Sequence, residues 1–330
     1  MGCELKAKDI IQNILTVTSK KPQQDSTNAF APINIALVKY WGKRNVELKL
    51  PMTSSFSMTI KELGTYITLT KSDSYEIFLN GDLMENDSQF SKRIIDYLKL
   101  FNFDCKFKII TKNTVPTSAG LASSSSGFSA LVLALNDMFQ WNFDKKTLSI
   151  LSRIASGSAC RSLYNGFTEW HKGSREDGMD SYATPYSKNI DDLCVSLLIN
   201  DAGTKYISSS VAMQKSLESR YYNAWQDIVE ENIKNLKQTI KDNDFIRFGT
   251  IIEQNSLHMH AICNSVGIFY NNDKTIGMIN KIQGLRQLGV NIFFTQDAGP
   301  NLVVLYLKKD LEKIKKQMPD FPKSYSINTV

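Results

Sequence analysis

Cysteine and histidine are scarce in this sequence, and their scarcity excludes several classes of protein. The 330 residues include five widely spaced cysteines, and no two of them form a Cys-x-x-Cys pair. A chain of this length needs no disulfide staples, so an odd, scattered set favours free thiols in a reducing compartment, and we expect a cytoplasmic protein. His171, His258 and His260 have no neighbouring partners suited to a zinc site, so we expect ordinary surface or core roles for them.

Long apolar runs and several familiar motifs are missing as well. No run of about 18 apolar residues occurs, and the N-terminus has no apolar signal region, so we expect neither a membrane span nor secretion. The sequence also lacks Gly-x-Gly-x-x-Gly, Gly-x-x-x-x-Gly-Lys-Ser/Thr and Gly-x-Ser-x-Gly. These absences exclude Rossmann, protein-kinase and Walker A loops and the nucleophile elbow of hydrolases.

The composition is that of an ordinary globular protein with a modest excess of positive charge. Hydrophobic residues make up 42% and charged residues 22%, and the 39 basic and 33 acidic side chains leave a formal charge of +6. Acidic and basic residues are mixed along most of the chain, which argues against a nucleic-acid-binding arm and suits a small anionic ligand. A length of 330 residues favours two lobes over a single core.

Apolar periodicity and turn residues predict a mixture of strands and helices in both halves of the chain. We expect a polar N-terminal extension over residues 1–28, a first lobe over 29–200 and a second over 201–330, in the α+β class. Expected strands cover 30–41, 55–60, 65–70, 75–82, 105–111, 166–170, 193–200, 291–307 (two strands) and 325–330. Expected helices cover 5–18, 87–101 with Asp87 as the N-cap, 127–139, 144–155, 229–240, 243–262, 275–289 and 308–318.

The stretch PTSAGLASSSSG, residues 116–127, places four consecutive serines between an expected strand and a buried helix. A glycine-containing loop at the start of a helix directs backbone N–H groups and the positive end of the helix dipole at one point, where an anion can bind. Serine hydroxyls add donors and can reach a Mg²⁺ ion that a nucleotide brings. A serine-rich N-cap without a ligand is the structural alternative.

This stretch resembles the phosphate loop of the GHMP kinase superfamily, whose pattern is Pro-x-x-x-Gly-Leu-small-Ser-Ser. The resemblance implies a two-lobed fold with a first lobe like ribosomal protein S5 and a ferredoxin-like second lobe. It also implies ATP as co-substrate with Mg²⁺, which the Ser124 hydroxyl would reach through the bound nucleotide. The ATP-binding residues that it implies are Pro116, Gly120, Leu121, Ala122, Ser123, Ser124 and Ser125.

A second segment, APINIALVKYWGKRN at residues 31–45, gathers basic, aromatic and amide side chains at the end of an expected strand. It resembles the N-terminal signature of the mevalonate diphosphate decarboxylase family, as does LPMTSSFSMTI at 50–60. GSACRS at 157–162 and TQDAGPN at 295–301 match the same family. Solvated lysines, an Arg161 that caps a helix and a turn aspartate at 297 are the structural alternatives.

The resemblance implies roles for individual residues. Asp297 would be the catalytic base, and Arg161 would hold the carboxylate that leaves as CO₂, because a guanidinium grips a carboxylate at two points. Asn34 and Lys39 complete the implied catalytic set. The substrate-binding residues that it implies are Tyr40, Trp41, Lys43, Ser156, Ser158 and Ser209.

The implied reaction is the ATP-dependent decarboxylation of mevalonate 5-diphosphate to isopentenyl diphosphate, with release of ADP, phosphate and CO₂. Two related activities stay open: a GHMP small-molecule kinase that stops after phosphorylation, and a decarboxylase of the monophosphate. A basic RNA-binding module is a rival from another class, although the basic patch at 39–44 is small. We expect small-molecule partners only, with no nucleic acid or membrane, and a homodimer.

Overall fold

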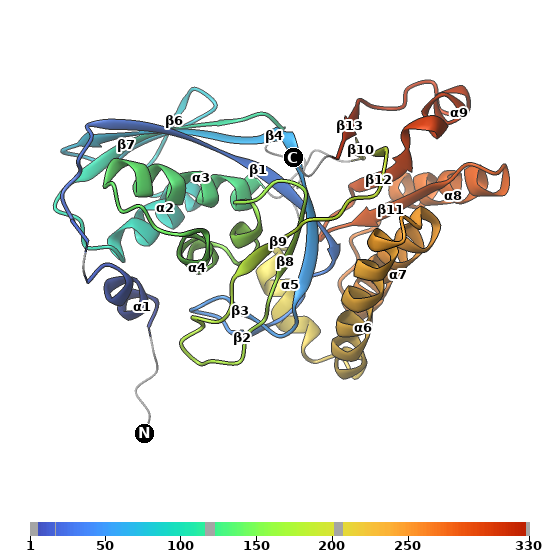
Figure 1. The fold of residues 1–330 in the computed structure, drawn as a ribbon, viewed down its shortest axis with the longest axis horizontal. Coiled ribbons are helices and arrows are strands. Elements are labelled where there is room, and N and C mark those ends of the chain that lie inside the picture. The colour runs from blue at the N-terminus through green and yellow to red at the C-terminus, as the bar shows by residue number, and fades with distance from the viewer. Residues whose placement is uncertain (1–5, 17, 116–122, 201–206, 328–330) are drawn as a thin grey trace.

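The computed structural model describes residues 6–16, 18–115, 123–200 and 207–327, and it consists of two lobes, each built on its own sheet (Figure 1). A small two-stranded sheet of β2 (Lys43–Asn45) and β3 (Leu50–Pro51) accompanies them. Within the described residues, no helix combines the length and apolarity needed to cross a membrane.

The first lobe contains a seven-stranded sheet in the order β6-β5-β7-β4-β8-β9, with β1 paired to β4. Its strands are β1 (Ser26–Val38), β4 (Ser55–Ser72), β5 (Glu76–Leu79), β6 (Asp82–Met84), β7 (Lys106–Asn113), β8 (Phe167–Trp170) and β9 (Ala183–Tyr186). The β5–β7 pair is parallel, and β1 runs antiparallel to β4 along most of its length.

Helices cover one face of this sheet and bury its apolar side chains (Figure 1). The helical segments are α1 (Ala7–Ile14), α2 (Gln89–Lys99), α3 (Ser123–Met138), α4 (Lys145–Ala155) and the 3₁₀ turn η2 (Gly157–Arg161). Side chains alternate between the faces of a strand, so Ile67 and Leu69 of β4 point toward Leu131 and Leu135 of α3 in one core. The predicted buried helix after the serines is therefore confirmed.

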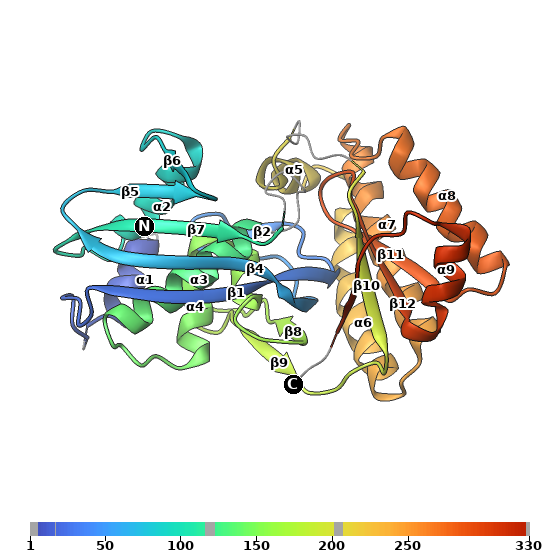
Figure 2. The same cartoon turned by 90° about the horizontal axis from the view of Figure 1, so that it is seen from above.

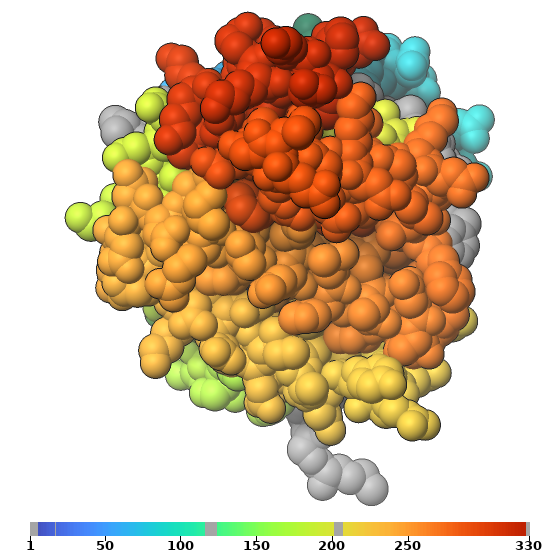
Figure 3. Space-filling model, turned by 90° about the vertical axis from the view of Figure 1, so that its right-hand side faces the viewer, coloured from blue at the N-terminus to red at the C-terminus, as the bar shows by residue number. Residues whose placement is uncertain are grey.

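The second lobe contains a four-stranded antiparallel sheet in the order β11-β12-β10-β13. Its strands are β10 (Leu193–Leu198), β11 (Ile292–Gln296), β12 (Leu302–Leu307) and β13 (Ser324–Ser326). Its helical segments are α5 (Ser209–Ser216), α6 (Tyr222–Lys241), α7 (Phe245–Ser265), α8 (Asp273–Gln287), η3 (Lys308–Asp310) and α9 (Leu311–Gln317). From the side, α6, α7 and α8 cover the outer surface of this lobe, with α9 at the top (Figure 3).

Because side chains alternate between the two faces of these strands, the sheet packs against two different hydrophobic cores. Val303 and Leu305 of β12 belong to the core that contains α6 and α7 and extends into the first lobe. Leu302 and Val304, on the opposite face, belong to a separate core with α8 and α9. The second lobe is thus anchored to the first by a shared apolar core.

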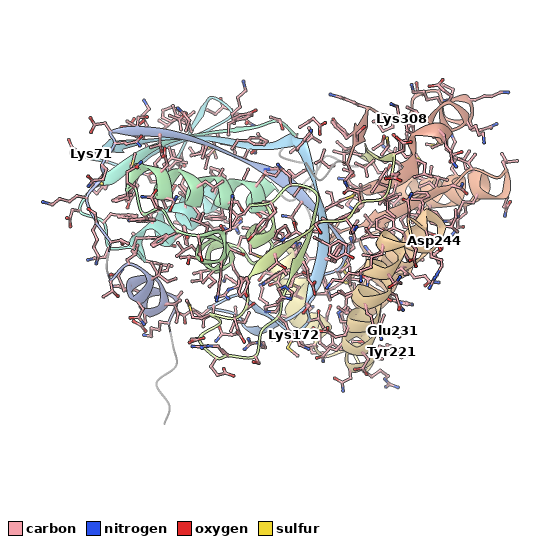
Figure 4. All side chains as sticks on the ribbon, viewed as in Figure 1. Lys71, Lys172, Tyr221, Glu231, Asp244 and Lys308 are labelled. Carbon is pink, nitrogen blue, oxygen red and sulfur yellow. The ribbon has the colours of Figure 1, made fainter. Side chains whose placement is uncertain are left out.

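Other contacts also join the lobes. Lys172, which follows β8 and is labelled in Figure 4, forms an ion pair of 3.1 Å with Glu230 of α6. The indole N–H of Trp41 donates to Ser216 Oγ at 2.8 Å. Seen from above, α5 lies between the two lobes (Figure 2). Contacts from several parts of the chain therefore hold the two lobes together.

Three details differ from the sequence-based expectations. Residues 55–60 and 65–70 belong to one strand, β4, because a bulge at the register shift between Pro32 and Ile33 takes up the residues between them. Ser88, not Asp87, is the N-cap of α2, and its hydroxyl accepts from the Ser91 N–H.

The third detail concerns the ends of the lobes. Strand β10 pairs with the second sheet, although it precedes the boundary expected after residue 200. Helix α1 packs into the first-lobe core through Ile10 and Ile11, so the N-terminal segment is not a free extension at this point. The division at 28 and 200 stays a prediction.

Candidate active site

A buried lysine and a partly exposed aspartate meet between the lobes. Lys39 directly follows β1, Asp297 directly follows β11, and Lys39 Nζ lies 2.6 Å from Asp297 Oδ1, with side chains 2% and 34% exposed. Lys39 Nζ also donates to the Ala36 carbonyl at 2.9 Å. Burial lowers the pKa of Lys39, and the charge of Asp297 opposes that shift. The Asp297 carboxylate is thus bound to a buried ammonium, and its side chain is partly accessible to solvent.

A second group of buried polar residues connects Arg161 to the start of α3. Arg161 Nε donates to Asn34 Oδ1 at 3.1 Å, and the Asn34 amide donates to Ser125 Oγ at 3.3 Å. Asn34 also donates to Ser162 Oγ at 2.7 Å, and Arg161 Nη1 donates to Ser55 Oγ at 2.5 Å. Arg161 therefore does not cap a helix but is fixed in orientation by the network.

The Lys39–Asp297 pair and the network around Arg161 interact electrostatically. Burial lowers the pKa of Arg161, while the nearby Cys160 and Asp297 oppose that shift. The charge of Arg161 in turn contributes to lowering the pKa of Lys39. Asp297, Lys39 and Arg161, which come from distant parts of the chain, therefore form one electrostatic unit.

Helix α7 supports this unit from the second lobe. Asn255 Oδ1 accepts from the Lys39 backbone N–H at 2.8 Å. Ser256 Oγ accepts from the Gln296 N–H at 2.9 Å and donates to the Gln296 carbonyl at 3.1 Å. His260 is buried behind Asp297, and burial, followed by the charge of Lys39, lowers its pKa to about 4. Its imidazole is therefore neutral at pH 7, as expected for a core histidine.

The two aromatic residues after Lys39 point in different directions. Tyr40 packs edge-to-face on Trp170 with ring centroids 4.6 Å apart, and its buried hydroxyl has no hydrogen-bond partner in the described part of the chain. Trp41 is 2% exposed and bonded to Ser216. Tyr40 thus has an unused polar atom near Arg161, whereas Trp41 is committed to packing between the lobes.

The basic residues predicted to gather at the end of β1 do not converge. Lys39 contacts Asp297, whereas Lys43 Nζ donates to Ser210 Oγ at 2.7 Å. Arg44 donates to the carbonyls of Lys172 and Arg175. Lys43 and Ser210 line a pocket of about 250 Å³ that also involves Val46, Val211 and Met213. Positive charge is therefore distributed along the site rather than concentrated at one point.

The remaining predicted residues differ in how much the structure says of them. Ser209 is the first residue of α5, Ser156 precedes η2, and the Ser158 carbonyl accepts from the Asn34 amide at 3.1 Å. Ser124 is exposed and Ser125 is buried in the first turn of α3. Four predicted ATP-binding residues and one side chain fall outside the described part: Pro116, Gly120, Leu121, Ala122 and the side chain of Ser123.

No group of three or more His, Cys, Asp or Glu side chains that could hold a metal ion occurs within the described residues. Magnesium commonly keeps several waters and binds through substrate phosphates and one or two protein oxygens. The exposed Ser124 hydroxyl at the start of α3 fits that mode, in which a nucleotide supplies most of the ligands.

Comparison with known proteins decides the family. A model described as the diphosphomevalonate decarboxylase-like N-terminal domain matches residues 31–183, and one for the mevalonate 5-diphosphate decarboxylase C-terminal domain matches residues 195–329. A diphosphomevalonate decarboxylase of Candida albicans is 33% identical over 312 residues, which cover 88% of this chain and 86% of that protein. This chain belongs to the diphosphomevalonate decarboxylase family. The family expected from the sequence is thus confirmed.

Solved structures of this family share the fold. Mevalonate diphosphate decarboxylase from Staphylococcus aureus has a TM-score of 0.86 and 34% identity, covering 93% of this chain and 96% of that one. The Enterococcus faecalis enzyme gives 0.82 and 35%, covering 92% and 97%. A structure described as MDDEF in complex with MVAPP, AMPPCP and magnesium gives 0.84 and 36%, with the same coverage. The predicted two-lobed α+β fold is confirmed.

Within this decarboxylase fold, sequence reasoning missed the residues that orient the predicted ones. Ser55, Ser162 and Asn255 contact Arg161, Asn34 and Lys39, yet none was assigned a role. Ser55 and Ser162 lie within or at the end of the matched segments 50–60 and 157–162, so their positions offered a signal. Asn255 offered none, because its contact depends on how the two lobes dock.

Proposed function

We propose that this chain catalyses the ATP-dependent decarboxylation of mevalonate 5-diphosphate to isopentenyl diphosphate, with release of ADP, phosphate and CO₂. The observation that carries the proposal is the junction of the Lys39–Asp297 ion pair with the Arg161–Asn34–Ser125 network. The names of the relatives support the same reaction. They lend no support to a kinase that stops after phosphorylation or to a monophosphate decarboxylase.

Asp297 is the residue suited to act on the substrate hydroxyl. A tertiary alcohol is a hindered nucleophile, so a carboxylate must orient it and accept its proton as phosphate is transferred. The partly exposed Asp297 carboxylate provides an acceptor at a ligand-accessible position. Lys39 fixes one of its oxygens at 2.6 Å. Lys39 thus positions the base.

Arg161 is the residue suited to hold the carboxylate that leaves as CO₂. Departure of the new phosphate leaves developing positive charge at carbon three, and loss of CO₂ from the adjacent acid neutralises it. Arg161 must therefore hold that acid in line without moving. Its bonds to Asn34 and Ser55 and its position 5.8 Å from the Trp170 ring centroid supply this rigidity.

The start of α3 is suited to ATP. Ser124 is exposed at this end of the helix, and Ser125 is linked to the catalytic network through Asn34. The family relation and the described complex with AMPPCP and magnesium support ATP and Mg²⁺ here. Magnesium bound to ATP would spread the charge of the transferring phosphate. The loop before α3 would complete the phosphate contacts.

The other end of the substrate would lie along Tyr40, Lys43, Ser158 and Ser209. The Tyr40 hydroxyl, which has no partner within the described residues, and the Lys43 ammonium, which donates to Ser210, are the donors that would serve it. Ser156 would be a more peripheral contact. We further propose a cytoplasmic location, which the free thiols Cys105, Cys160 and Cys194 support. Light scattering would test the proposed homodimer.

A substrate panel tests the proposal. Purified protein is supplied with ATP, Mg²⁺ and one of mevalonate, its 5-phosphate or its 5-diphosphate, and release of ADP is followed. We expect turnover on the diphosphate to exceed that on the other two by at least tenfold in kcat/KM. Equal or faster turnover on the monophosphate or on mevalonate would refute the proposal.

A further inference from the structure

Strand β11, which ends one residue before Asp297, lies at the edge of the second sheet. On an antiparallel edge strand, the N–H and C=O groups of every second residue point away from the sheet and need other partners. Helix α7 runs beside this edge in two views (Figures 1 and 2). Side chains supply the partners here. The Ile292 carbonyl accepts from Arg286 Nη1 at 3.4 Å, and the Phe294 N–H donates to Glu253 Oε2 at 3.2 Å.

Ser256 of α7 holds the last residue of β11. Its Oγ accepts from the Gln296 N–H at 2.9 Å and donates to the Gln296 carbonyl at 3.1 Å. Both side chains are buried. One hydroxyl therefore satisfies both backbone groups that the last residue of the strand directs away from the sheet. The next residue is Asp297, so its place is set by α7 as well as by the pairing of β11 with β12.

Asn255, the preceding residue of α7, holds the other half of the ion pair. Its Oδ1 accepts from the Lys39 backbone N–H at 2.8 Å. The side chain is buried, and its Nδ2 has no hydrogen-bond partner within the described residues. A buried amide with an unused donor costs stability relative to an apolar side chain of the same shape. A role in placing Lys39 accounts for an amide that stability alone disfavours.

The ends of β1 and β11 are also joined directly. Thr295 Oγ1 donates to the Ala36 carbonyl at 3.3 Å, and Lys39 Nζ donates to the same carbonyl at 2.9 Å. Successive residues of an α-helix lie about 100° apart around its axis, so Asn255 and Ser256 can each reach a different strand. One turn of α7 thus fixes both strand ends that carry the Lys39–Asp297 pair.

We propose that Asn255 and Ser256 are positioning residues for the reaction: Ser256 sets the place of Asp297, and Asn255 sets the place of Lys39. This inference rests on the proposed function, in which Asp297 orients the substrate hydroxyl and accepts its proton. Both side chains act through the backbone groups that they hold. Because transfer rates depend steeply on the placement of the reacting groups, losing either contact should lower kcat and leave KM unchanged.

Kinetics of Ser256 variants test the first half of this proposal. Ser256→Ala removes both bonds to Gln296, whereas Ser256→Thr keeps the hydroxyl. Ser196→Ala is the matched control, because Ser196 is equally buried, donates to the Lys323 carbonyl at 3.0 Å and lies two strands away from β11. We expect kcat to fall at least about tenfold in Ser256→Ala, with KM for ATP and for mevalonate 5-diphosphate within twofold of wild type. Ser256→Thr should recover most of the loss, and the control should keep its kcat.

Asn255→Leu separates positioning from stability. The change leaves the Lys39 N–H without its acceptor but also removes the unused Nδ2 donor. These two effects on stability oppose each other, so the melting temperature should change little while kcat falls at least about tenfold. The inference is overturned if kcat in both Asn255→Leu and Ser256→Ala stays within threefold of wild type. It is equally overturned if Ser196→Ala loses as much kcat as Ser256→Ala.

Amide hydrogen exchange followed by NMR gives a readout that needs no turnover. The Gln296 amide should exchange at least about tenfold faster in Ser256→Ala, because its acceptor is lost, and at the wild-type rate in Ser196→Ala. An unchanged Gln296 rate in Ser256→Ala would show that Ser256 does not hold this strand end. A wild type that releases no CO₂ would refute the proposed reaction, whereas the exchange result bears on the positioning alone.

Discussion

Replacing either partner of the Lys39–Asp297 pair should abolish the same activity but change stability by different amounts. Removing one partner of a buried ion pair typically costs about 3–5 kcal/mol. The Asp297 side chain is 34% exposed, and solvent screening reduces this to roughly 1–3 kcal/mol for Asp297→Asn. That variant leaves the Lys39 ammonium, 2% exposed, without its anion.

Lys39→Met should be the milder change. It removes the buried charge, and Asp297 stays partly solvated. The Ala36 carbonyl loses the bond from Lys39 but keeps the one from Thr295 Oγ1 at 3.3 Å. We therefore expect a loss of about 1 kcal/mol or less. Urea unfolding at pH 7 measures both free energies of unfolding. A larger loss in Lys39→Met than in Asp297→Asn would refute this account of the pair.

The pH dependence gives an independent check. The pKa of Lys39 is lowered in the folded chain, and Asp297 opposes that shift, so Asp297→Asn should lower the folded pKa further. Between the folded and unfolded pKa values the unfolded chain binds more protons, so stability rises with pH by up to about 1.4 kcal/mol per unit. The deficit of Asp297→Asn should therefore shrink as the pH rises from 7 toward 10. A deficit that does not change with pH would contradict the argument.

Activity should fall in both variants because the proposed base is lost or displaced. Loss of a general base typically costs about 10²–10⁴ in rate. We expect kcat for ADP release to fall by at least about 100-fold in Asp297→Asn, while circular dichroism shows a folded chain. Retention of a tenth or more of wild-type kcat would remove Asp297 from the mechanism.

Four other variants test the surrounding structure. Arg161→Lys should lose at least about 100-fold in kcat, because an ammonium cannot bond both of the positions that the guanidinium spans; steady-state kinetics with a matched melting curve checks this. Gly42→Ala should destabilise the chain strongly, because the φ of Gly42 is +99° and an added Cβ would overlap the Tyr222 hydroxyl. Gly277→Ala, on α8 with open space around it, should raise the free energy of unfolding by up to about 1 kcal/mol. Urea unfolding compares the two variants. The pKa of His260 is lowered to about 4, so between about pH 6.5 and pH 4 the unfolded chain binds a proton that the folded chain does not. As the pH falls through that range, the free energy of unfolding should decrease in wild type and decrease less in His260→Gln. An equal decrease in both proteins would contradict the lowered pKa of His260.

Local signals predicted most of the secondary structure. Val229 and Ile240 mark a helical repeat that forms α6, and Asn80-Gly81 forms the expected turn, with φ of 54° and 103°. These elements depend on residues a few positions apart, where periodicity and turn chemistry act directly. The bulge that merges residues 55–70 into one strand was not predictable, because it arises from pairing with β1.

The candidate site was predicted through motifs, but its internal arrangement was not. Lys39 and Asp297 are 258 positions apart, so their contact depends on how two lobes dock. Adjacent basic residues looked equivalent in the sequence, yet Lys39 is buried against Asp297 while Lys43 faces Ser210. The direction of a side chain after the end of a strand is set by tertiary packing, which a linear pattern does not contain.

The stoichiometry of CO₂ and ADP tests the central claim most directly. Mevalonate 5-diphosphate labelled at its carboxyl carbon is turned over by the purified chain with ATP and Mg²⁺, and trapped CO₂ is counted against ADP in the same sample. We predict one CO₂ for each ADP throughout the reaction. ADP formed without CO₂ would show a chain that phosphorylates its substrate and stops, and would contradict the account.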